Sequence, residues 1–329
     1  MSIINKNAIL IAGMHRSGTS ALTRVISFLG ADLPTNLVPA LPENNETGFW
    51  ESVDLLIQHD KLLHSAGSSW SDWTEFNVDW YDSVVGRKYH QVISDIVKNN
   101  FSASNFFVVK DPRICRILPF WLNIIQQQKI QPFVIIPIRN PLEVAQSLKA
   151  RDGFPLAKGG LIWLRHVLDA VFFSQGHPVA FVAYEKLMQD WKSVIDSITS
   201  QCGLRFPRIS VQSALEIEQY IDQKQKHNSF HLDSVHLCRD FSPLISDVYA
   251  LLSQLVRNEE RSSVISKLLE IRKQFNENSL IFAKAINSSE SFYIQELVSS
   301  QSRYESQIQR QEESFRLQLQ QKEESLKSK

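Results

Sequence analysis

Short apolar segments alternate with longer amphipathic ones along most of this 329-residue chain. The apolar segments are Ala8–Ala12, Phe106–Lys110, Phe133–Ile138 and Val179–Tyr184. Such runs are typical of strands buried on both faces. The amphipathic segments between them include Ser20–Leu29, Tyr81–Asn99, Pro141–Ala150 and Leu161–Ser174. Strand, crossover helix and strand in turn predict an α/β fold with a central parallel sheet flanked by helices. Its ligand is expected beyond the carboxyl ends of the strands.

The sequence changes in character near residue 287. We expect one domain over residues 1–287, with its motifs within about 7–230 and a helical remainder over 231–287. Ser288–Lys329 contains no Gly or Pro. Its apolar residues recur at intervals of seven and four, which is typical of a coiled coil, although Gln301 and Gln311 weaken the seam. The tail is therefore expected to be a solvated helix that pairs with itself or a partner, or a frayed helical end.

The composition argues against several classes of protein. Lys plus Arg and Asp plus Glu both number 35, whereas domains that coat nucleic acid carry a basic excess. The longest apolar runs are far shorter than the roughly 20 residues of a membrane-spanning helix, so no span is expected. The start lacks the features of a secretory signal, and the three cysteines show no CxxC spacing. A reducing cytoplasm is the simplest expected location, and no metal site is expected.

The segment AILIAGMHRSGTSAL combines a strand that ends at Ala12, a loop between Gly13 and Gly18, and a helix that begins near Thr19. Unpaired backbone N–H groups at a helix N-terminus favour an anion, and glycines let the backbone approach it closely. Arg16 adds a fixed positive charge. The segment predicts a phosphate-binding turn and a P-loop-like fold. The alternative, a tight turn without a ligand, gives no packing reason for Arg16.

The loop differs from the nucleoside-triphosphate loop GxxxxGK[ST] at one decisive position. Gly13 and Gly18 have the right spacing, but Thr19 stands where that loop has its Lys. This Lys neutralises the β- and γ-phosphates, so an ordinary ATP-dependent kinase is disfavoured.

The loop GMHRSGTSAL resembles the 5′-phosphosulfate loop of sulfotransferases that use 3′-phosphoadenosine 5′-phosphosulfate (PAPS), and is closest to a bacterial branch with GxxRSGTS. The resemblance covers roughly residues 7–230. It implies that the loop binds the 5′-phosphate and sulfonate. The loop residues concerned are Gly13, His15, Arg16, Ser17, Gly18, Thr19 and Ser20.

Two further segments carry the same resemblance. PFVIIPIRNPLEVAQSLKARDGF is similar to the 3′-phosphate site, in which an Arg at a strand end and a Ser eight positions later bind the phosphate; Arg139 and Ser147 have that spacing. IDQKQKHN is similar to a basic segment that closes over the nucleotide, with Lys226 where relatives often have Arg.

The resemblance implies transfer of a sulfonate from PAPS to an acceptor hydroxyl or amine, with 3′,5′-diphosphoadenosine (PAP) as product and no metal. Arg16 and Lys110 are the expected catalytic cations, Lys110 because related saccharide sulfotransferases have a Lys-x-Pro turn here. Glu51 is the first candidate for the general base and His59 the second. The alternatives are a carboxylate that complements a helix dipole for Glu51, and a surface or capping histidine for His59.

The acceptor is less constrained by the sequence. Trp50, Trp70, Trp73 and Trp80 lie near hydroxyl and carboxylate groups, which suits a saccharide or glycolipid, although tryptophans are also core residues. A small phenol or alcohol is the alternative acceptor. A non-catalytic nucleotide-binding scaffold is the alternative from another class. Two pairs of residues have simpler expectations. Asp111 and Arg113 are expected to pair with each other, with contact to the acceptor as the alternative, and Trp163 and His166 are expected to pack in the core.

Overall fold

The computed structural model describes residues 6–41, 47–224, 235, 238–279, 281–282, 295 and 299. The chain forms two compact units, Met1–Phe275 and Asn276–Lys329, and the architecture below is that of the first. Lys226 lies outside the described residues, as does the expected tail over 288–329 except for two helical positions.

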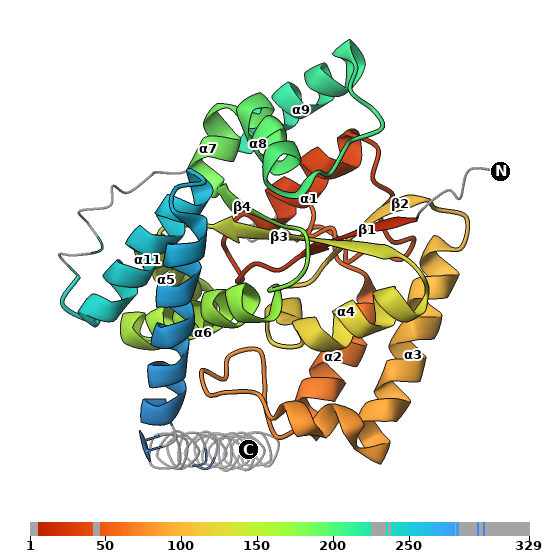
Figure 1. Ribbon diagram of the computed structural model, residues 1–329. Coiled ribbons are helices and arrows are strands. Elements are labelled where there is room, and N and C mark those ends of the chain that lie inside the picture. The colour runs from red at the N-terminus through yellow and green to blue at the C-terminus, as the bar shows by residue number, and fades with distance from the viewer. Residues whose placement is uncertain are drawn as a thin grey trace, which may run out of the picture. The chain divides into compact units, whose positions relative to one another are not determined.

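A four-stranded parallel sheet forms the centre of the first unit (Figure 1). Its strands are β1 (Asn7–Ile11), β2 (Phe106–Lys110), β3 (Gln131–Ile138) and β4 (Val179–Ala183). The spatial order is β2-β1-β3-β4, so the chain crosses from one side of β1 to the other between β2 and β3. The predicted α/β fold with a central parallel sheet is confirmed.

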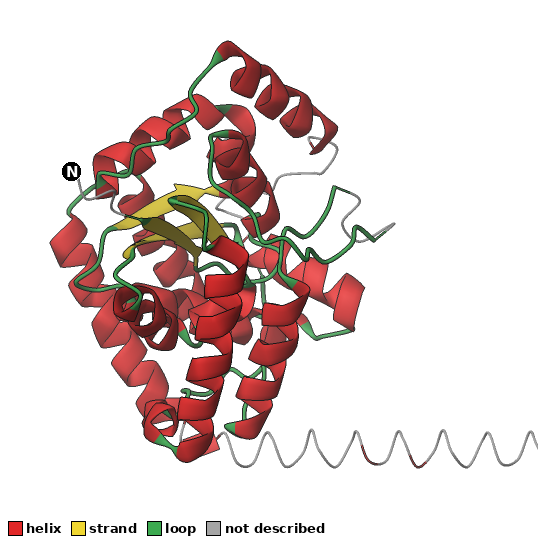
Figure 2. Cartoon of the chain, turned by 90° about the vertical axis from the view of Figure 1, so that its right-hand side faces the viewer, coloured by secondary structure: helices red, strands yellow, loops and turns green. Residues whose placement is uncertain are grey.

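Helices cover both faces of the sheet (Figures 1 and 2). One face carries α1 (Thr19–Phe28), α7 (Tyr184–Gln189), α8 (Trp191–Cys202) and α9 (Val211–Lys224). The other carries α2 (Val53–Ser65), α3 (Val84–Phe101), α4 (Leu118–Gln127), α5 (Pro141–Asp152) and α6 (Leu156–Phe173). Helix α11 (Pro243–Val256) packs against β4 and α6. Within the described ranges, no helix has the length and hydropathy that a bilayer span requires.

Strand β3 begins two residues earlier than predicted and contains Pro132 and Pro137. Proline cannot donate to a ladder and is normally kept out of central strands. Here the ladders are staggered, because β1 pairs with Gln131–Ile135 and β4 pairs with Val134–Ile138. Pro132 therefore has only β1 beside it, and Pro137 has only β4 beside it. This explains how a central strand can contain two prolines.

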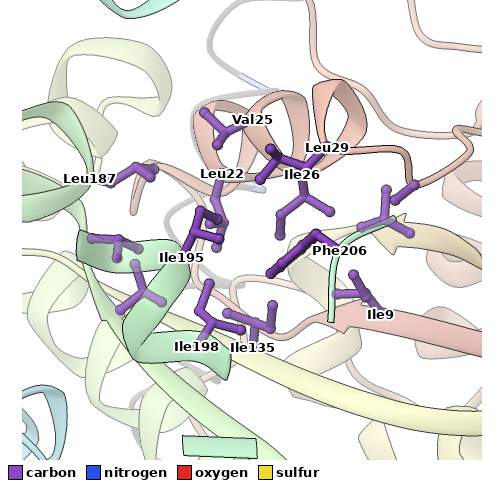
Figure 3. Close-up of a cluster of buried hydrophobic side chains, with 14 of the residues drawn as sticks. Ile9, Leu22, Val25, Ile26, Leu29, Ile135, Leu187, Ile195, Ile198 and Phe206 are labelled. Carbon is purple, nitrogen blue, oxygen red and sulfur yellow. The ribbon is translucent and has the colours of Figure 1, made fainter. Parts of the chain in front are cut away.

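The core between the sheet and the helices α1 and α8 fixes the start of α1 (Figure 3). Leu22 and Ile26 of α1 pack with Ile195 of α8 and with Ile9 and Ile135 of the sheet, and almost no surface of these side chains is exposed. Burial of each such side chain contributes about 1.5–3 kcal/mol. The helix is therefore held with its N-terminus at the carboxyl end of β1.

A buried cluster of charges ties α6 to residues 72–74. Asp169 is fully buried and accepts hydrogen bonds from Arg165 Nη1 (3.2 Å) and Arg272 Nε (2.8 Å), with Arg116 Nε at 3.9 Å. Arg116 and Arg165 also donate to the backbone carbonyls of residues 72–74. Because buried charges are costly unless paired, this cluster holds the segment in one position against α6.

Candidate active site

A cavity of about 420 Å³ lies at the carboxyl edge of the sheet. All four strands lead into it: the loop after β1, Lys110 at the end of β2, Arg139 after β3 and Tyr184 after β4 line its wall. In open α/β sheets this edge is where ligands bind, and the size suits a small molecule.

The β1–α1 loop has the geometry of an anion site. Arg16 (φ 67°) and Gly18 (φ 80°) both adopt the left-handed region. A Cβ on Gly13 would lie 2.4 Å from Pro137 Cγ and 2.7 Å from Thr19 Cγ2, so only glycine fits there. No described side chain caps the N-terminus of α1, and the buried Ser17 hydroxyl has no hydrogen-bond partner among the described residues. These groups suit a phosphate-like ligand.

Arg16, Arg139 and Ser147 come together although they are far apart in the sequence. Arg16 Nε donates to Ser147 Oγ (2.7 Å), and Arg139 Nη1 donates to the carbonyl of Arg16 (2.9 Å). Arg139 also pairs with Glu143 (2.7 Å), and its guanidinium lies over the ring of Tyr184, 4.4 Å from the centroid. The result is a patch of two guanidinium groups beside the N-terminus of α1.

Tyr184 is a site residue that the sequence analysis did not select. Its ring packs so closely on the loop that a Cβ on Gly18 would lie 2.1 Å from Tyr184 Cδ2. Its position could have identified it, because it ends the fourth predicted strand and so lies at the same edge of the sheet as Lys110 and Arg139.

Lys110 and Glu51 form a buried ion pair in the cavity wall, with exposed fractions of 4% and 5%. Lys110 Nζ also donates to Ser20 Oγ and to the carbonyl of Phe49, both at 3.2 Å. Burial raises the pKa of Glu51, and the neighbouring charge of Lys110 only partly opposes this. The pair joins the segment before α2 to the end of β2.

His59 is fully buried in α2 and does not line the cavity. Its Nδ1 lies 2.8 Å from Asp111 Oδ2, and its Nε2 accepts a hydrogen bond from Trp121 Nε1 (3.0 Å). The alternative of a surface or capping histidine is therefore wrong. Its burial depends on the packing of α2 against the turn after β2, which the local sequence does not reveal.

The expected pairing of Asp111 with Arg113 is confirmed at 3.1 Å. Arg113 also binds Asp60 of α2, with Nη2 3.0 Å from Oδ2. Burial would raise the pKa of Asp111, but Arg113 and then His59 outweigh it and hold this pKa well below its usual value. Asp111 is therefore a carboxylate at neutral pH.

A second part of the cavity wall combines aromatic and charged groups. The rings of His15 and Trp70 lie 4.5 Å apart, and Arg151 lies over Trp70 at 5.3 Å while pairing with Asp152 (2.8 Å). Burial, then the charges of Arg113 and Arg151, hold the pKa of His15 well below its ordinary value, so His15 is neutral near pH 7. Its buried Nε2 has no hydrogen-bond partner within the described part of the chain.

Only Trp70 of the four tryptophans considered for the acceptor lines the cavity. Trp73 is buried against Phe275, and Trp80 packs with other aromatic rings. Trp50 lies under the guanidinium of Arg24. Sequence proximity therefore did not bring these rings together at one site.

Trp163 and His166 are fully buried in α6, which confirms their expected packing role. Among the described residues, no group of three or more His, Cys, Asp or Glu side chains is placed to hold a metal ion.

Replacing Gly18 with alanine should destabilise the protein more than the same change at Gly153. Both glycines have positive φ, but a Cβ on Gly153 meets nothing within 4 Å. The conformational cost for alanine is about 1–2 kcal/mol at either position. Overlap with Tyr184 adds about 1–3 kcal/mol at Gly18 alone. Urea unfolding measures both losses, and equal losses would contradict the close packing of Tyr184 on the loop.

Comparison with known proteins gives only structural similarity. No family model matches the chain, and no curated protein matches its sequence. A sulfotransferase domain from the Synechococcus PCC 7002 olefin synthase is 17% identical, with 75% of this chain and 94% of that chain covered and a TM-score of 0.38. A sulfotransferase domain from the curacin biosynthetic pathway is 17% identical, with 76% of this chain and 97% of that chain covered and a TM-score of 0.38. A sulfotransferase from Mycobacterium avium is 12% identical, with 77% of this chain and 77% of that chain covered and a TM-score of 0.43.

Proposed function

We propose that this protein is a sulfotransferase that moves a sulfonate from PAPS to an acceptor hydroxyl or amine and releases PAP. The observation that carries the proposal is the convergence of Arg16, Arg139 and Ser147 beside the uncapped N-terminus of α1. A nucleotide with phosphates at both its 3′ and 5′ positions needs cations and hydroxyls from two separate segments, and the loop and the start of α5 supply them.

The loop would hold the 5′-phosphosulfate through its backbone amides and the hydroxyls of Ser17, Thr19 and Ser20. The unpaired Ser17 hydroxyl fits such a group. Arg139 and Ser147 would bind the 3′-phosphate, since guanidinium groups form charge-assisted hydrogen bonds with phosphate oxygens.

When bound, PAPS supplies an electrophilic sulfur and a leaving phosphate. Glu51 would remove the acceptor proton as the transfer proceeds. Lys110 contacts Oε1 of Glu51, so Oε2 is the oxygen that would accept the proton. Burial raises the pKa of Glu51 towards neutrality, which makes it a stronger base than an exposed carboxylate.

The cations would stabilise the charge that develops during transfer. Arg16 lies in the loop that would hold the 5′-phosphosulfate, and Lys110 lines the same cavity. Burial lowers the pKa of Arg16, but a guanidinium stays protonated at neutral pH. Both side chains would therefore act by charge, and neither is assigned a proton transfer.

A saccharide, free or on a glycolipid, is the proposed acceptor. Trp70 offers the cavity an aromatic face, and the neighbouring Arg151–Asp152 pair offers hydrogen-bonding groups. Sugars use both kinds of contact, because their C–H faces pack on rings while their hydroxyls need polar partners.

A reducing, cytoplasmic location belongs to the same proposal. Cys115, Cys202 and Cys238 all lie within the described residues and are all unpaired. Burial raises the pKa of Cys115 and of Cys202, which keeps these two thiols protonated and unreactive.

Calorimetric titration should show that PAP binds and that Arg139→Ala weakens the binding at least about 10-fold. Hydrogen bonds to a charged group contribute about 1.5–3 kcal/mol, which sets this magnitude. Arg257→Ala is the matched control, since Arg257 is also paired with a carboxylate but lies on the surface. Its affinity for PAP should equal that of the wild type.

The same titration with ATP and magnesium distinguishes the sulfotransferase from the two alternatives, a small-molecule kinase and a non-catalytic nucleotide-binding scaffold. Binding of ATP–magnesium without PAP would replace the proposal by a small-molecule kinase. Failure of both to bind would indicate a non-catalytic scaffold.

Glu51→Gln should lower kcat by about 10²–10⁴-fold, the usual contribution of a general base, while PAP affinity is retained. Asp54→Asn is the control, because Asp54 is an exposed carboxylate three residues away at the start of α2. Near-normal turnover by Glu51→Gln with PAP still bound would exclude Glu51 as the base.

Trp70→Ala should raise the KM for a saccharide acceptor by roughly 3–10-fold and leave the KM for PAPS unchanged. An aromatic contact of about 0.5–1.5 kcal/mol gives this range. Trp80→Ala, outside the cavity, serves as the control. Sulfated product that appears only on phenols or simple alcohols would contradict the saccharide proposal.

A further inference from the structure

Helix α2 and the residues just before it are joined to the turn after β2 by two ion pairs and, between them, a hydrogen bond. In chain order they are Glu51–Lys110, His59–Asp111 and Asp60–Arg113. The first pair lines the cavity and the third is half exposed on its aspartate side. The second lies wholly inside the protein and has no part in the proposed chemistry.

Asp111 and Trp121 together occupy both ring nitrogens of His59. Trp121 Nε1 is only a donor, so His59 Nε2 must accept from it and Nδ1 must carry the proton that is donated to Asp111. Neither ring nitrogen is left for a proton from an acceptor. His59, the second candidate for the general base after Glu51, is therefore unsuited to that role.

Asp111 connects His59 to the cavity through the backbone. Its Oδ1 accepts from the backbone N–H of Arg113 (2.9 Å), which fixes the short 3₁₀ helix η2 (Pro112–Cys115). Lys110 directly precedes Asp111, and Glu51 directly precedes the N-cap Ser52 of α2. A shift between α2 and the turn would thus change the distance between Lys110 and Glu51.

We propose that His59 is a positioning residue that keeps the ammonium of Lys110 against the carboxylate of Glu51 by holding Asp111. The Asp60–Arg113 pair stabilises the contact between α2 and the turn less than His59–Asp111 does, because Asp60 is half exposed and solvent screens its charge. The part of this inference that concerns turnover rests on the proposed function, whereas the coupling between His59 and the Glu51–Lys110 pair does not.

The titration of Glu51 reports the coupling. Three charged groups face its carboxylate: Lys110, which lowers its pKa, Asp111, which raises it, and Arg113, which lowers it. Lys110 is the nearest and has the largest effect of the three. If Lys110 moves away, the pKa of Glu51 must rise further above its usual value.

The decisive pair of variants is His59→Gln and His59→Asn. The amide of asparagine lies near the position of Nδ1 and can still donate to Asp111. The amide of glutamine lies near Nε2 and retains only the contact with Trp121. His64→Gln is the control, because His64 is an exposed histidine in the same helix.

The measurement is an NMR titration of ¹³C-labelled glutamate side chains in the full chain, with the Glu51 signal identified by its loss in Glu51→Gln. His59→Gln should raise the pKa of Glu51 by about 1 unit, equivalent to a tenfold change in proton affinity. His59→Asn and His64→Gln should leave it unchanged. In turnover, the acid limb of kcat should move by the same amount in His59→Gln alone, with an unchanged KM for PAPS.

The outcomes separate this inference from the proposed function. A folded His59→Gln variant with the wild-type Glu51 titration would overturn the positioning role, even if the enzyme is active. A raised Glu51 pKa in a protein that transfers no sulfonate would support the positioning role and remove the proposed function. If His59→Gln does not fold, His59→Leu, which also lacks the donor to Asp111, gives the same test.

Discussion

The parallel pairing of β1 with β2 and β3 is the constraint on which the rest of the structure depends. Its backbone hydrogen bonds set Ile11 beside Lys110 on one side and Ile135 on the other. The loops that follow the strands must then leave at one edge of the sheet. Arg16 and Arg139 meet there because β1 and β3 are neighbours, not because their segments share any local pattern. The apolar layer under α1 fixes the third component, the N-terminus of that helix.

Four basic side chains around the cavity each come with their own carboxylate, and the loop residue Arg16 donates to Ser147. The pairs are Lys110–Glu51, Arg113–Asp60, Arg139–Glu143 and Arg151–Asp152. This agrees with a chain that has no net charge and still offers a local cationic site. Paired cations are held in place before a ligand arrives, so little reorganisation is needed when charge develops. Arg139 donates through Nε to Glu143 and through Nη1 to the carbonyl of Arg16, so a phosphate there would share the guanidinium with both partners.

The sequence was sufficient for the strands and for the turn between β1 and α1, because each depends on residues close together in the chain. Apolar runs predict buried strands, and a Gly-bounded turn before a helix predicts an anion site, whereas the attention to Arg139 and Ser147 came from the family resemblance. Tyr184 and the burial of His59 could not be predicted, since both depend on which segments pack together in three dimensions. The acceptor role expected of the four tryptophans could not be predicted for the same reason. They lie within one stretch of the sequence, but only Trp70 of the four lines the cavity, and Arg116 and Arg165 hold residues 72–74 against the core.

The choice between Glu51 and His59 as base shows what local reasoning lacks. Both are titratable, both lie at or in α2, and an isolated imidazole has the more suitable pKa. Burial makes Glu51 the better candidate of the two. It leaves His59 saturated with hydrogen bonds, while it raises the pKa of Glu51 and keeps that carboxylate at the cavity. A raised pKa costs free energy in the folded state, because a buried ion pair is desolvated on both sides. The cost is tolerated where neighbouring contacts hold both partners. Lys110 also donates to Ser20 Oγ and to the carbonyl of Phe49, and His59 holds the adjacent Asp111.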